Sequence, residues 1–534
     1  MIHARPTFTL FRHDVEATFL RRPNRFRVEV ELQNTRRLII DAPTKAKGMP
    51  EVQEATKRID GIHTRAEEAK KRPADTARPE DIVGTEDAPT LTGDASGTMS
   101  APPDARETMA PKVTTLTETV PAHCPNPGRL LELLLPGTRV ILEARRENLA
   151  GARGKTAQSG AESTRFTEGG TEWQYSQEGK ANGLLPWKEG WKGGEGDGKA
   201  GAERAPRKTE YTLVAAYTRT GGGTSRVVPL YSSRLNQLAE ALIIPRLFPD
   251  ARRIQREVQW GDSRCDFFVE DGGGKGHFLE VKGCTLVEYG VAMFPDAPSS
   301  RAVRHLQELA DAARAGYGAH VVFILTHGPV AKFIPNLHTD PEFAWTLSQV
   351  SPSVRIHAVE VEADREGRAW IVREDIPVDL SHGKLAMEDR GSYLVTFRLN
   401  TRCRLSVGSL GEVEFFPGWY VYAGSAQRGL SSRVARHLRL GGKKNQRKKY
   451  HWHIDYLSAV AEEALAYPIA SYRNLECDLA KGLAEIGGKP IEGFGSSDCS
   501  CGSHLFYFAD PRAPQDTWQF VDLVLRFRHL VFSE

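Results

Sequence analysis

The chain has 534 residues, more than one hydrophobic core supports, so we expect two or three domains. Its formal net charge is only +3, and nucleic acid would therefore have to bind at local basic patches. No stretch approaches the roughly eighteen apolar residues that span a bilayer, and the N-terminus lacks an apolar signal core. The seven cysteines are odd in number and thinly spread, which favours a reducing cytoplasm over a disulfide framework.

Two segments are too poor in apolar residues to form a packed core. Residues 43–118 contain no Phe, Tyr or Trp, and residues 147–207 consist largely of Gly, Lys, Glu and Thr with a few lone tryptophans. Such segments cannot bury enough apolar surface to offset chain entropy, and we predict two disordered insertions. Removing them joins alternating, strand-like pieces into a small antiparallel barrel. The barrel segments are 1–42, 119–146 and 208–231.

Residues 232–380 alternate between helix-like and strand-like stretches, which predicts an α/β domain. The apolar run 321–325 is typical of a buried strand, and together with the strand around Glu280 it predicts a β-α-β crossover. The expected boundaries are, in chain order, a helix capped by Ser233, a helix opened by Ser299 or Ser300, a helix that begins at Pro341 and a strand over 354–361.

The hairpin over residues 264–284 carries the strongest chemical signal. Two strands meet at the turn formed by Gly272, Gly273 and Gly274, which brings Asp266 beside Glu280. Because side chains alternate along a strand, Glu280 and Lys282 share one face. Two carboxylates can hold a divalent cation, and the lysine can meet a phosphate or a nucleophilic water. A surface ion pair on an exposed hairpin remains the alternative.

A third unit follows a polar bridge over 382–389. Strand-like runs at 393–397 and 419–422 precede a helix over 431–440. We place this unit at residues 388–512 and expect it to fold independently, with 513–534 as a C-terminal extension.

The first 380 or so residues resemble the sugar fermentation stimulation protein A family. The resemblance rests on residues 22–26, 122–129, 280–285, 294–298 with Arg301 and His305, and 340–343. It implies an OB-like N-terminal barrel, a central domain similar to PD-(D/E)xK nucleases, and DNA binding. It also implies catalytic roles for Asp266, Glu280 and Lys282, with Mg²⁺ or Mn²⁺ held by Asp266 and Glu280.

The third unit resembles a GIY-YIG domain of α+β fold. The resemblance rests on Gly391-Ser392-Tyr393, on Tyr422-Ala423-Gly424-Ser425, and on Leu430, Arg433 and His437 at the family's spacing. It implies that Tyr393 and Tyr422 orient a water, that Arg433 steadies phosphate and that Glu476 holds a cation. Ala423 stands where the family commonly has Ile.

Several basic and polar residues are candidate nucleic-acid contacts. Each has a simpler interpretation, because charge runs are usually solvated and Asn in a Pro-Asn-Pro-Gly loop serves the turn. With the resemblance we favour contacts with phosphate or bases. The candidates are Arg22, Arg25, Asn126, Arg129, Arg301, His305, His437, Lys443, Lys444 and Lys448.

Four residues raise the question of zinc: Cys477, Cys499, Cys501 and His504. Cys-x-Cys followed by His three residues later lacks the usual ligand spacing, which weighs against zinc.

We therefore predict a cytoplasmic, metal-dependent nuclease with two hydrolytic centres. Nucleic acid is the expected partner, DNA or RNA, with no membrane, and a homodimer is left open. The alternative is a DNA-binding regulator of sugar-metabolism genes that does not cleave; binding without metal and with a steep salt dependence would favour it.

Overall fold

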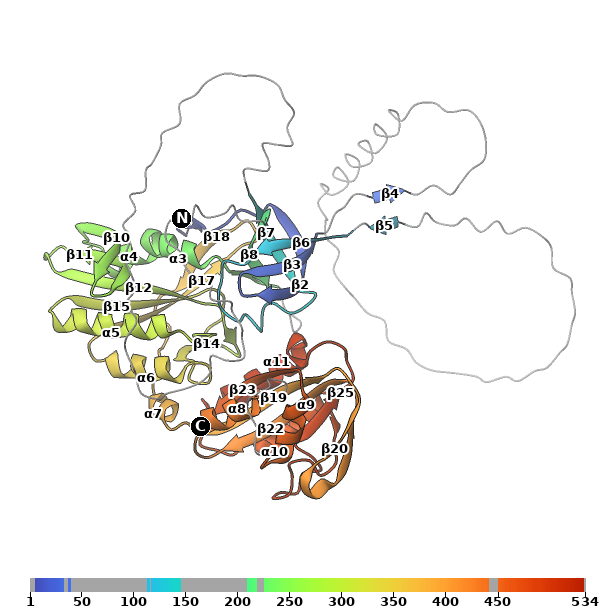
Figure 1. Ribbon diagram of the computed structural model, residues 1–534. Helices are drawn as coiled ribbons and strands as arrows, with labels where there is room; N and C mark the ends of the chain where they lie inside the picture. Colours follow the sequence, from blue (N-terminus) through green and yellow to red (C-terminus); the bar gives the residue numbers. More distant parts are fainter. Residues whose placement is uncertain are drawn as a thin grey trace, which may run out of the picture. The chain divides into compact units, whose positions relative to one another are not determined.

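The computed structural model describes residues 5–32, 37–39, 113–115, 117–145, 209–218, 225–440 and 450–532 (Figure 1). The predicted insertions lie outside these ranges, except for 113–115 and 117–118, and so do Lys443, Lys444 and Lys448. Among the described helices, none is long and apolar enough to cross a membrane. A small separate unit, Asn34–Leu116, contains β4 (Arg37–Ile39) paired antiparallel with β5 (Val113–Thr115).

The N-terminal strands close into a five-stranded barrel, as predicted, but one pair of its strands, Glu118–His123 with Tyr211–Tyr217, is parallel, whereas the sequence predicted an antiparallel barrel. Along β3, Val28, Val30 and Leu32 are buried while the intervening charged residues face outward. The barrel closes because β7 pairs with β8 as well as with β2, and Arg145 N donates to Glu210 O at 3.0 Å where that pair ends. The barrel strands are β2 (Val15–Asn24), β3 (Arg27–Leu32), β6 (Glu118–His123), β7 (Arg139–Ala144) and β8 (Tyr211–Tyr217).

The central domain is built on a mixed sheet that continues from the barrel through β9 (Val227–Pro229). The order runs β10-β11-β12-β15-β17, with β12, β15 and β17 parallel and the β10–β12 hairpins antiparallel. The predicted β-α-β crossover is thus confirmed. The strands are β10 (Arg253–Trp260), β11 (Ser263–Glu270), β12 (Gly276–Cys284), β15 (Gly318–Leu325), β17 (Arg355–Ala363) and β18 (Arg368–Arg373), which pairs with β17 and β1 (Phe8–Thr9). A separate small sheet contains β13 (Val287–Glu288), β14 (Val291–Phe294) and β16 (Lys332–Pro335).

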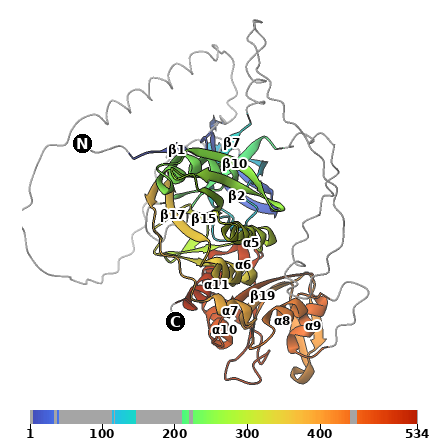
Figure 2. The ribbon, with the colours of Figure 1, turned by 90° about the vertical axis from the view of Figure 1, so that its left-hand side faces the viewer.

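Helices cover both faces of the central sheet (Figures 1 and 2). On one face α3 (Ser232–Leu238), η1 (Ala239–Ile243) and α4 (Ile244–Leu247) pack on Leu279 and Val281. On the other, α5 (Ser300–Arg314) and α6 (Pro341–Val350) share a core with Phe278. β12 therefore presents alternate side chains to two different cores, as its sequence predicted.

The predicted helix starts are confirmed at two of three positions. Ser299 caps α5 by accepting from Ala302 N, and Asp340 caps α6, which begins at Pro341. Ser233 does not cap its helix: α3 begins at Ser232 after Tyr231, and no side chain caps it. The segment predicted as a polar bridge contains the short helix α7 (Gly383–Met387).

The C-terminal unit is an antiparallel sheet in the order β23-β19-β22-β25-β24 with helices on both faces. Tyr393 and Tyr422 belong to one face, and Leu394 and Val421 to the other. The strands are β19 (Gly391–Leu399), β22 (Gly418–Ala426), β23 (Glu463–Ala470), β24 (Lys489–Pro490) and β25 (Leu505–Phe508), beside the hairpin β20 (Cys403–Ser406) and β21 (Glu412–Phe415). The helices are α8 (Leu430–His437), α9 (His453–Val460), α10 (Glu476–Glu485) and α11 (Trp518–Leu530), with the short turns η2 (Gly408–Leu410) and η3 (Pro514–Asp516).

Candidate metal and nucleic-acid sites

Asp266 lies where β11 and β12 separate. The last paired residues of this hairpin are Phe267 and Leu279. Beyond them the side chain of Asp266, and not the backbone of β11, is the hydrogen-bond partner of β12. Its Oδ2 accepts from Val281 N at 2.8 Å, and its Oδ1 accepts from Nδ2 of Asn236 at 2.8 Å. Asn236 lies on α3, far from the hairpin in sequence, and the motif gave no signal for it. Asp266 is therefore held at both oxygens and points toward β12.

Glu280 is the most deeply buried charged group of this site, with only 2 % of its surface exposed. Lys282 Nζ donates to its Oε1 at 2.5 Å, and Nδ1 of His305 contacts the same oxygen. Its second oxygen, Oε2, is buried and finds no hydrogen-bond partner among the described residues. A buried carboxylate oxygen without a partner is costly, so this atom is an acceptor that a further ligand could satisfy.

His305 is a buried partner of Glu280, which corrects the prediction that it contacts nucleic acid. Nε of Arg301 donates to Nε2 of His305 at 3.2 Å. That nitrogen must then be the acceptor, so the proton sits on Nδ1 and is donated to Glu280. Only 3 % of His305 is exposed, whereas Arg301 remains exposed at the outer end of the chain of contacts.

The surroundings of Asp266 and Glu280 shift the pKa values of the two carboxyl groups in opposite directions. Burial, and then the negative charge of Glu280, raise the pKa of Asp266 to about 6. Burial also acts to raise the pKa of Glu280, but Lys282 and His305 outweigh it and bring that pKa below its ordinary value. At neutral pH both carboxyl groups are ionised, and Asp266 is the one that takes up a proton first when the pH falls.

The barrel residues predicted to contact nucleic acid divide into two kinds. Arg22 donates to four backbone carbonyls, those of Arg25, Asn126, Gly128 and Arg129, at 2.5–3.1 Å. Asn126 Oδ1 accepts from Gly128 N at 2.9 Å, as expected for a turn residue. These two side chains therefore order the loop, while Arg129 is exposed on it.

Arg25 and Phe26 form an exposed pair at the tip of the β2–β3 hairpin. The guanidinium carbon of Arg25 lies 4.7 Å from the centroid of the Phe26 ring, and 45 % of Phe26 is exposed. Arg21 and Arg27 are exposed on either side. Exposed aromatic rings flanked by arginine are the elements on which single-stranded bases stack.

In the C-terminal unit the two tyrosines and His437 lie together. The Tyr393 hydroxyl and His437 Nε2 are 2.9 Å apart, and the rings of Tyr393 and Tyr422 lie 6.4 Å apart. Gly424 lies opposite Tyr393 on β22, and a Cβ there would collide with the phenol ring. His437 is 1 % exposed and part of this buried cluster, whereas the sequence predicted that it contacts nucleic acid.

Ser425 connects the predicted phosphate clamp to the predicted metal carboxylate. Nη1 of Arg433 donates to Ser425 O at 2.8 Å, and Ser425 Oγ donates to Oε2 of Glu476 at 2.6 Å. The other carboxylate oxygen of Glu476 lies 2.9 Å from Nδ1 of His504. Tyr422, Arg433 and Glu476 thus converge, but both oxygens of Glu476 already face protein groups.

The tyrosines are poorly suited to act as bases. Burial raises the pKa of Tyr393 well above its ordinary value, and burial followed by the charge of Glu476 does the same for Tyr422. Both phenols keep their protons at neutral pH. They can orient a water or a phosphate by hydrogen bonding, but they cannot deprotonate one.

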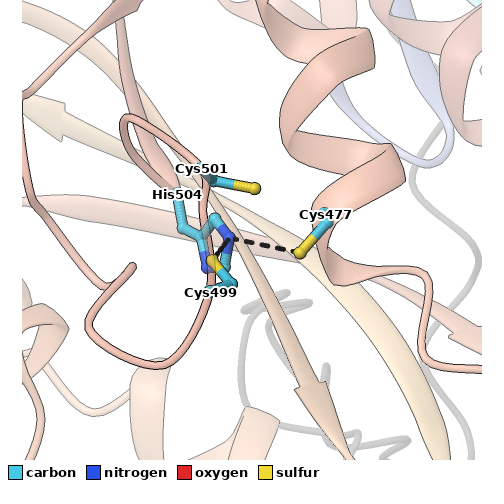
Figure 3. A group of neighbouring side chains, drawn as sticks. All are labelled: Cys477, Cys499, Cys501 and His504. Carbon is cyan, nitrogen blue, oxygen red and sulfur yellow. Dashed lines mark hydrogen bonds between the residues drawn. The ribbon is translucent and has the colours of Figure 1, made fainter.

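The sequence prediction against zinc is weakened by the structure. The side-chain ligand atoms of Cys477, Cys499, Cys501 and His504 all lie within 4.8 Å of one another (Figure 3). Spacing along the chain missed this because Cys477 comes from α10, whereas the other three come from the loop before β25.

Three family models match successive parts of the chain. Residues 110–159 match the SfsA N-terminal OB domain, and residues 233–367 match the sugar fermentation stimulation protein RE domain. Residues 392–523 match the domain of unknown function DUF123, which fits the predicted fusion of a C-terminal domain.

Curated relatives decide the family. A sugar fermentation stimulation protein homolog of Desulfitobacterium hafniense is 38 % identical over 161 residues, which are 30 % of this chain and 68 % of that protein. The chain belongs to the sugar fermentation stimulation protein family. Another member, from Pyrobaculum neutrophilum, is 37 % identical over 177 residues, covering 32 % of this chain and 72 % of the relative.

One solved structure of this family is also similar. It is Pyrococcus furiosus SfsA in complex with Ca²⁺, with a TM-score of 0.38 and 21 % sequence identity. The match covers 70 % of this chain and 99 % of that one.

Proposed function

We propose that this member of the sugar fermentation stimulation protein family hydrolyses phosphodiester bonds of nucleic acid in a central domain of the PD-(D/E)xK type. The observation that carries the proposal is the buried, unpartnered Oε2 of Glu280, beside a second carboxylate and a lysine. Other buried acceptors among the described residues also lack a partner, Oε2 of Glu308 for example, so it is the neighbouring Asp266 and Lys282 that make this oxygen a candidate for a further ligand.

The donor set fits a hard divalent cation. Asp266 and Glu280 would hold Mg²⁺ or Mn²⁺, since both metals prefer carboxylate oxygens. When bound, the cation supplies Lewis-acid stabilisation of the phosphate and lowers the pKa of a coordinated water.

The surrounding residues have distinct roles in this proposal. Lys282 lies at the more open end of the site, with 15 % of its side chain exposed, and its charge offsets that which develops on a reacting phosphate. Asn236 and His305 are positioning residues in this proposal, because each holds one of the two carboxylates. Such supporting contacts keep a site within the narrow geometry that catalysis needs.

Substrate binding is assigned to the barrel. The exposed Arg25–Phe26 pair supplies a stacking surface with positive charge, and OB barrels commonly bind single strands in this way. The barrel thereby gives the central site access to a strand with splayed bases.

A cleavage assay on single- and double-stranded DNA and RNA, with Mg²⁺, Mn²⁺ or EDTA, tests the function. We expect metal-dependent products from the full chain and a loss of at least about 100-fold for Glu280→Gln and Lys282→Ala. Matched controls are Lys275→Ala in the turn of the same hairpin and Glu270→Gln on β11, both expected to cleave normally. If the site variants and the wild type behave alike, the site is not catalytic.

One observation favours a second function, DNA binding without cleavage, as in a regulator. Oε1 of Glu280 is already engaged by both Lys282 and His305, an arrangement that a relic site used for docking would also show. This alternative predicts binding in EDTA with a steep salt dependence and no products with any metal.

A further inference from the structure

We propose that Cys477, Cys499, Cys501 and His504 bind one structural Zn²⁺ in the C-terminal domain. The proposed nuclease function of the central domain does not require this site, so the two proposals stand or fall separately.

The distances between the four ligand atoms match a single tetrahedral ion. Nε2 of His504 lies 3.4 Å from Sγ of Cys499 and 3.9 Å from Sγ of Cys477, and no pair in the group exceeds 4.8 Å. With Zn–S near 2.3 Å and Zn–N near 2.0 Å, the edges of the tetrahedron are about 3.5–3.8 Å. A contraction of about 1 Å or less brings every pair to that separation.

The ligands come from two elements that the fold already holds together. Cys477 is the second residue of α10, and the other three lie in the loop that leads into β25 (Figure 3). The base of that loop is closed by two backbone hydrogen bonds of 2.8 Å, from Gly493 N to Gly502 O and from His504 N to Phe494 O. The loop is therefore shaped before any ion arrives, which reduces the entropy cost of binding.

His504 has the environment of a metal ligand. Its Nδ1 faces Oε1 of Glu476 at 2.9 Å, which leaves Nε2 directed at the cysteine sulfurs. A carboxylate beside the far nitrogen is the usual neighbour of a zinc-bound histidine, although the 2.9 Å contact in this structure lacks hydrogen-bond geometry. Glu476 is itself held by Ser425 Oγ at 2.6 Å.

The ligand types select zinc and a structural role. Three thiolates and one imidazole suit Zn²⁺ better than the oxygen-seeking Mg²⁺ proposed for the central domain. Four protein ligands fill the tetrahedron, so no position remains open for a catalytic water. All seven cysteines of the chain lie in the described ranges and none is in a disulfide, which leaves these thiols available to an ion.

Such an ion would stabilise the loop that packs against Tyr422. Gly495 lies in the same loop, and a Cβ there would come within 3.0 Å of the Tyr422 ring and 3.5 Å of the Cβ of His504. Glu476 begins α10 immediately before Cys477. The zinc would thus hold the start of α10 against the loop that covers Tyr422.

Metal analysis of the full chain, purified under reducing conditions without added metal, provides the test. We expect close to one zinc per chain in the wild type and in Cys403→Ser, a control on a half-buried cysteine of the same domain outside the group. Cys499→Ser and Cys501→Ser should each lose most of the zinc. Iron instead of zinc, no metal even after refolding with zinc, or full zinc in both variants would overturn the proposal.

Loss of zinc from a misfolded variant would be uninformative, so the wild type is also tested with Co²⁺. Replacing the metal with Co²⁺ should give the intense visible bands of tetrahedral coordination and a sulfur-to-cobalt charge-transfer band, and stoichiometric Zn²⁺ should abolish both. His504→Cys keeps four ligands and should retain the metal with an altered cobalt spectrum. Weak octahedral bands in the wild type, or a spectrum unchanged in His504→Cys, would contradict a Cys₃His site.

Discussion

His305 and Glu280 meet inside the central domain, where Nδ1 of the imidazole contacts a carboxylate oxygen that Lys282 also contacts. The histidine comes from α5 and the glutamate from β12, so the crossover helix of the β-α-β unit supports the site across the layer. The charge of Lys282, and then the contact with His305, keep the pKa of this almost fully buried carboxylate below its ordinary value. His305 should therefore be needed for full metal affinity at this site.

Replacing His305 by alanine should weaken divalent-metal binding about 10- to 100-fold, as loss of a supporting contact to a metal ligand commonly does. His305→Gln can still donate to Glu280 and should recover part of the affinity. Calorimetric titration with Mn²⁺ measures the effect, and Gln307→Ala, an exposed neighbour on α5, is the matched control. Equal affinity in His305→Ala and wild type would remove the positioning role.

Metal affinity should also fall in acid. The pKa of Asp266 is raised to about 6, so a proton competes with the cation below that pH. We expect Mn²⁺ affinity to be nearly constant above about pH 7 and to fall up to about tenfold per pH unit below pH 6. Titrations between pH 5 and 8 check this, and a flat profile would contradict it.

The carboxyl group of Asp266 should also affect stability, with a pH dependence opposite to that of a salt-bridged carboxylate. Because the folded chain binds this proton more tightly than the unfolded chain, the stabilising contribution is present in acid and is lost as pH rises through 6. The rise from 3.8 to about 6 corresponds to at most about 3 kcal/mol. Asp266→Asn should therefore gain stability relative to wild type between pH 4 and 7 in EDTA. Thermal unfolding of both proteins in this pH range provides the comparison. A stability difference that does not change with pH would argue against a raised pKa of Asp266.

Phe26→Ala should weaken binding of single-stranded nucleic acid by about 1–3 kcal/mol, or about five- to 150-fold, through loss of stacking. Arg25→Ala should weaken binding less and reduce its salt dependence. Phe416 is the control, since 47 % of it is exposed and Arg402 lies over it at 5.1 Å, yet it is on the C-terminal domain. Fluorescence anisotropy measures all three, and an equal loss for Phe416→Ala would show that stacking is not specific to the barrel.

Gly424→Ala should destabilise the C-terminal domain by about 1–3 kcal/mol, because the new methyl group would overlap the Tyr393 ring. Tyr393→Phe loses one hydrogen bond with His437 and should cost about 1 kcal/mol. In the double variant Gly424→Ala, Tyr393→Ala the overlap is gone, so its loss of stability should be smaller than the sum of the losses of Gly424→Ala and of the single variant Tyr393→Ala. Thermal unfolding tests this, and strict additivity would place the overlap elsewhere.

Local sequence patterns predicted the elements of the fold well. The alternation in β3 and the β-α-β crossover follow from periodicities of burial, and the start of α6 follows from Asp340-Pro341. The prediction that Ser233 caps a helix was wrong because α3 already begins at Ser232, which places Ser233 inside its first turn and Tyr231 at the capping position. The helix α7 was missed because five residues give too short a period to detect.

Sequence patterns named most of the candidate site residues but not the contacts that other elements make with them. Asp266, Glu280 and Lys282 share one hairpin, so spacing found them. Asn236 and the pairing of His305 with Glu280 come from helices, and only the packing of these helices on the sheet assigns their partners. Cys477 was named with Cys499, Cys501 and His504 from the sequence, but it lies 22 positions before Cys499 in the chain, and only the fold shows it beside the other three.

The junction between β7 and β8 has a consequence for how the chain varies in length. Arg145 N donates to Glu210 O, so the chain leaves the barrel and returns to it at neighbouring points of one ladder. For a segment whose ends are already joined, each doubling of length costs only about 0.6 kcal/mol of closure entropy. The length of a segment inserted at this point therefore has little effect on the free energy of folding of the barrel. A reporter domain inserted here should cost the barrel little stability.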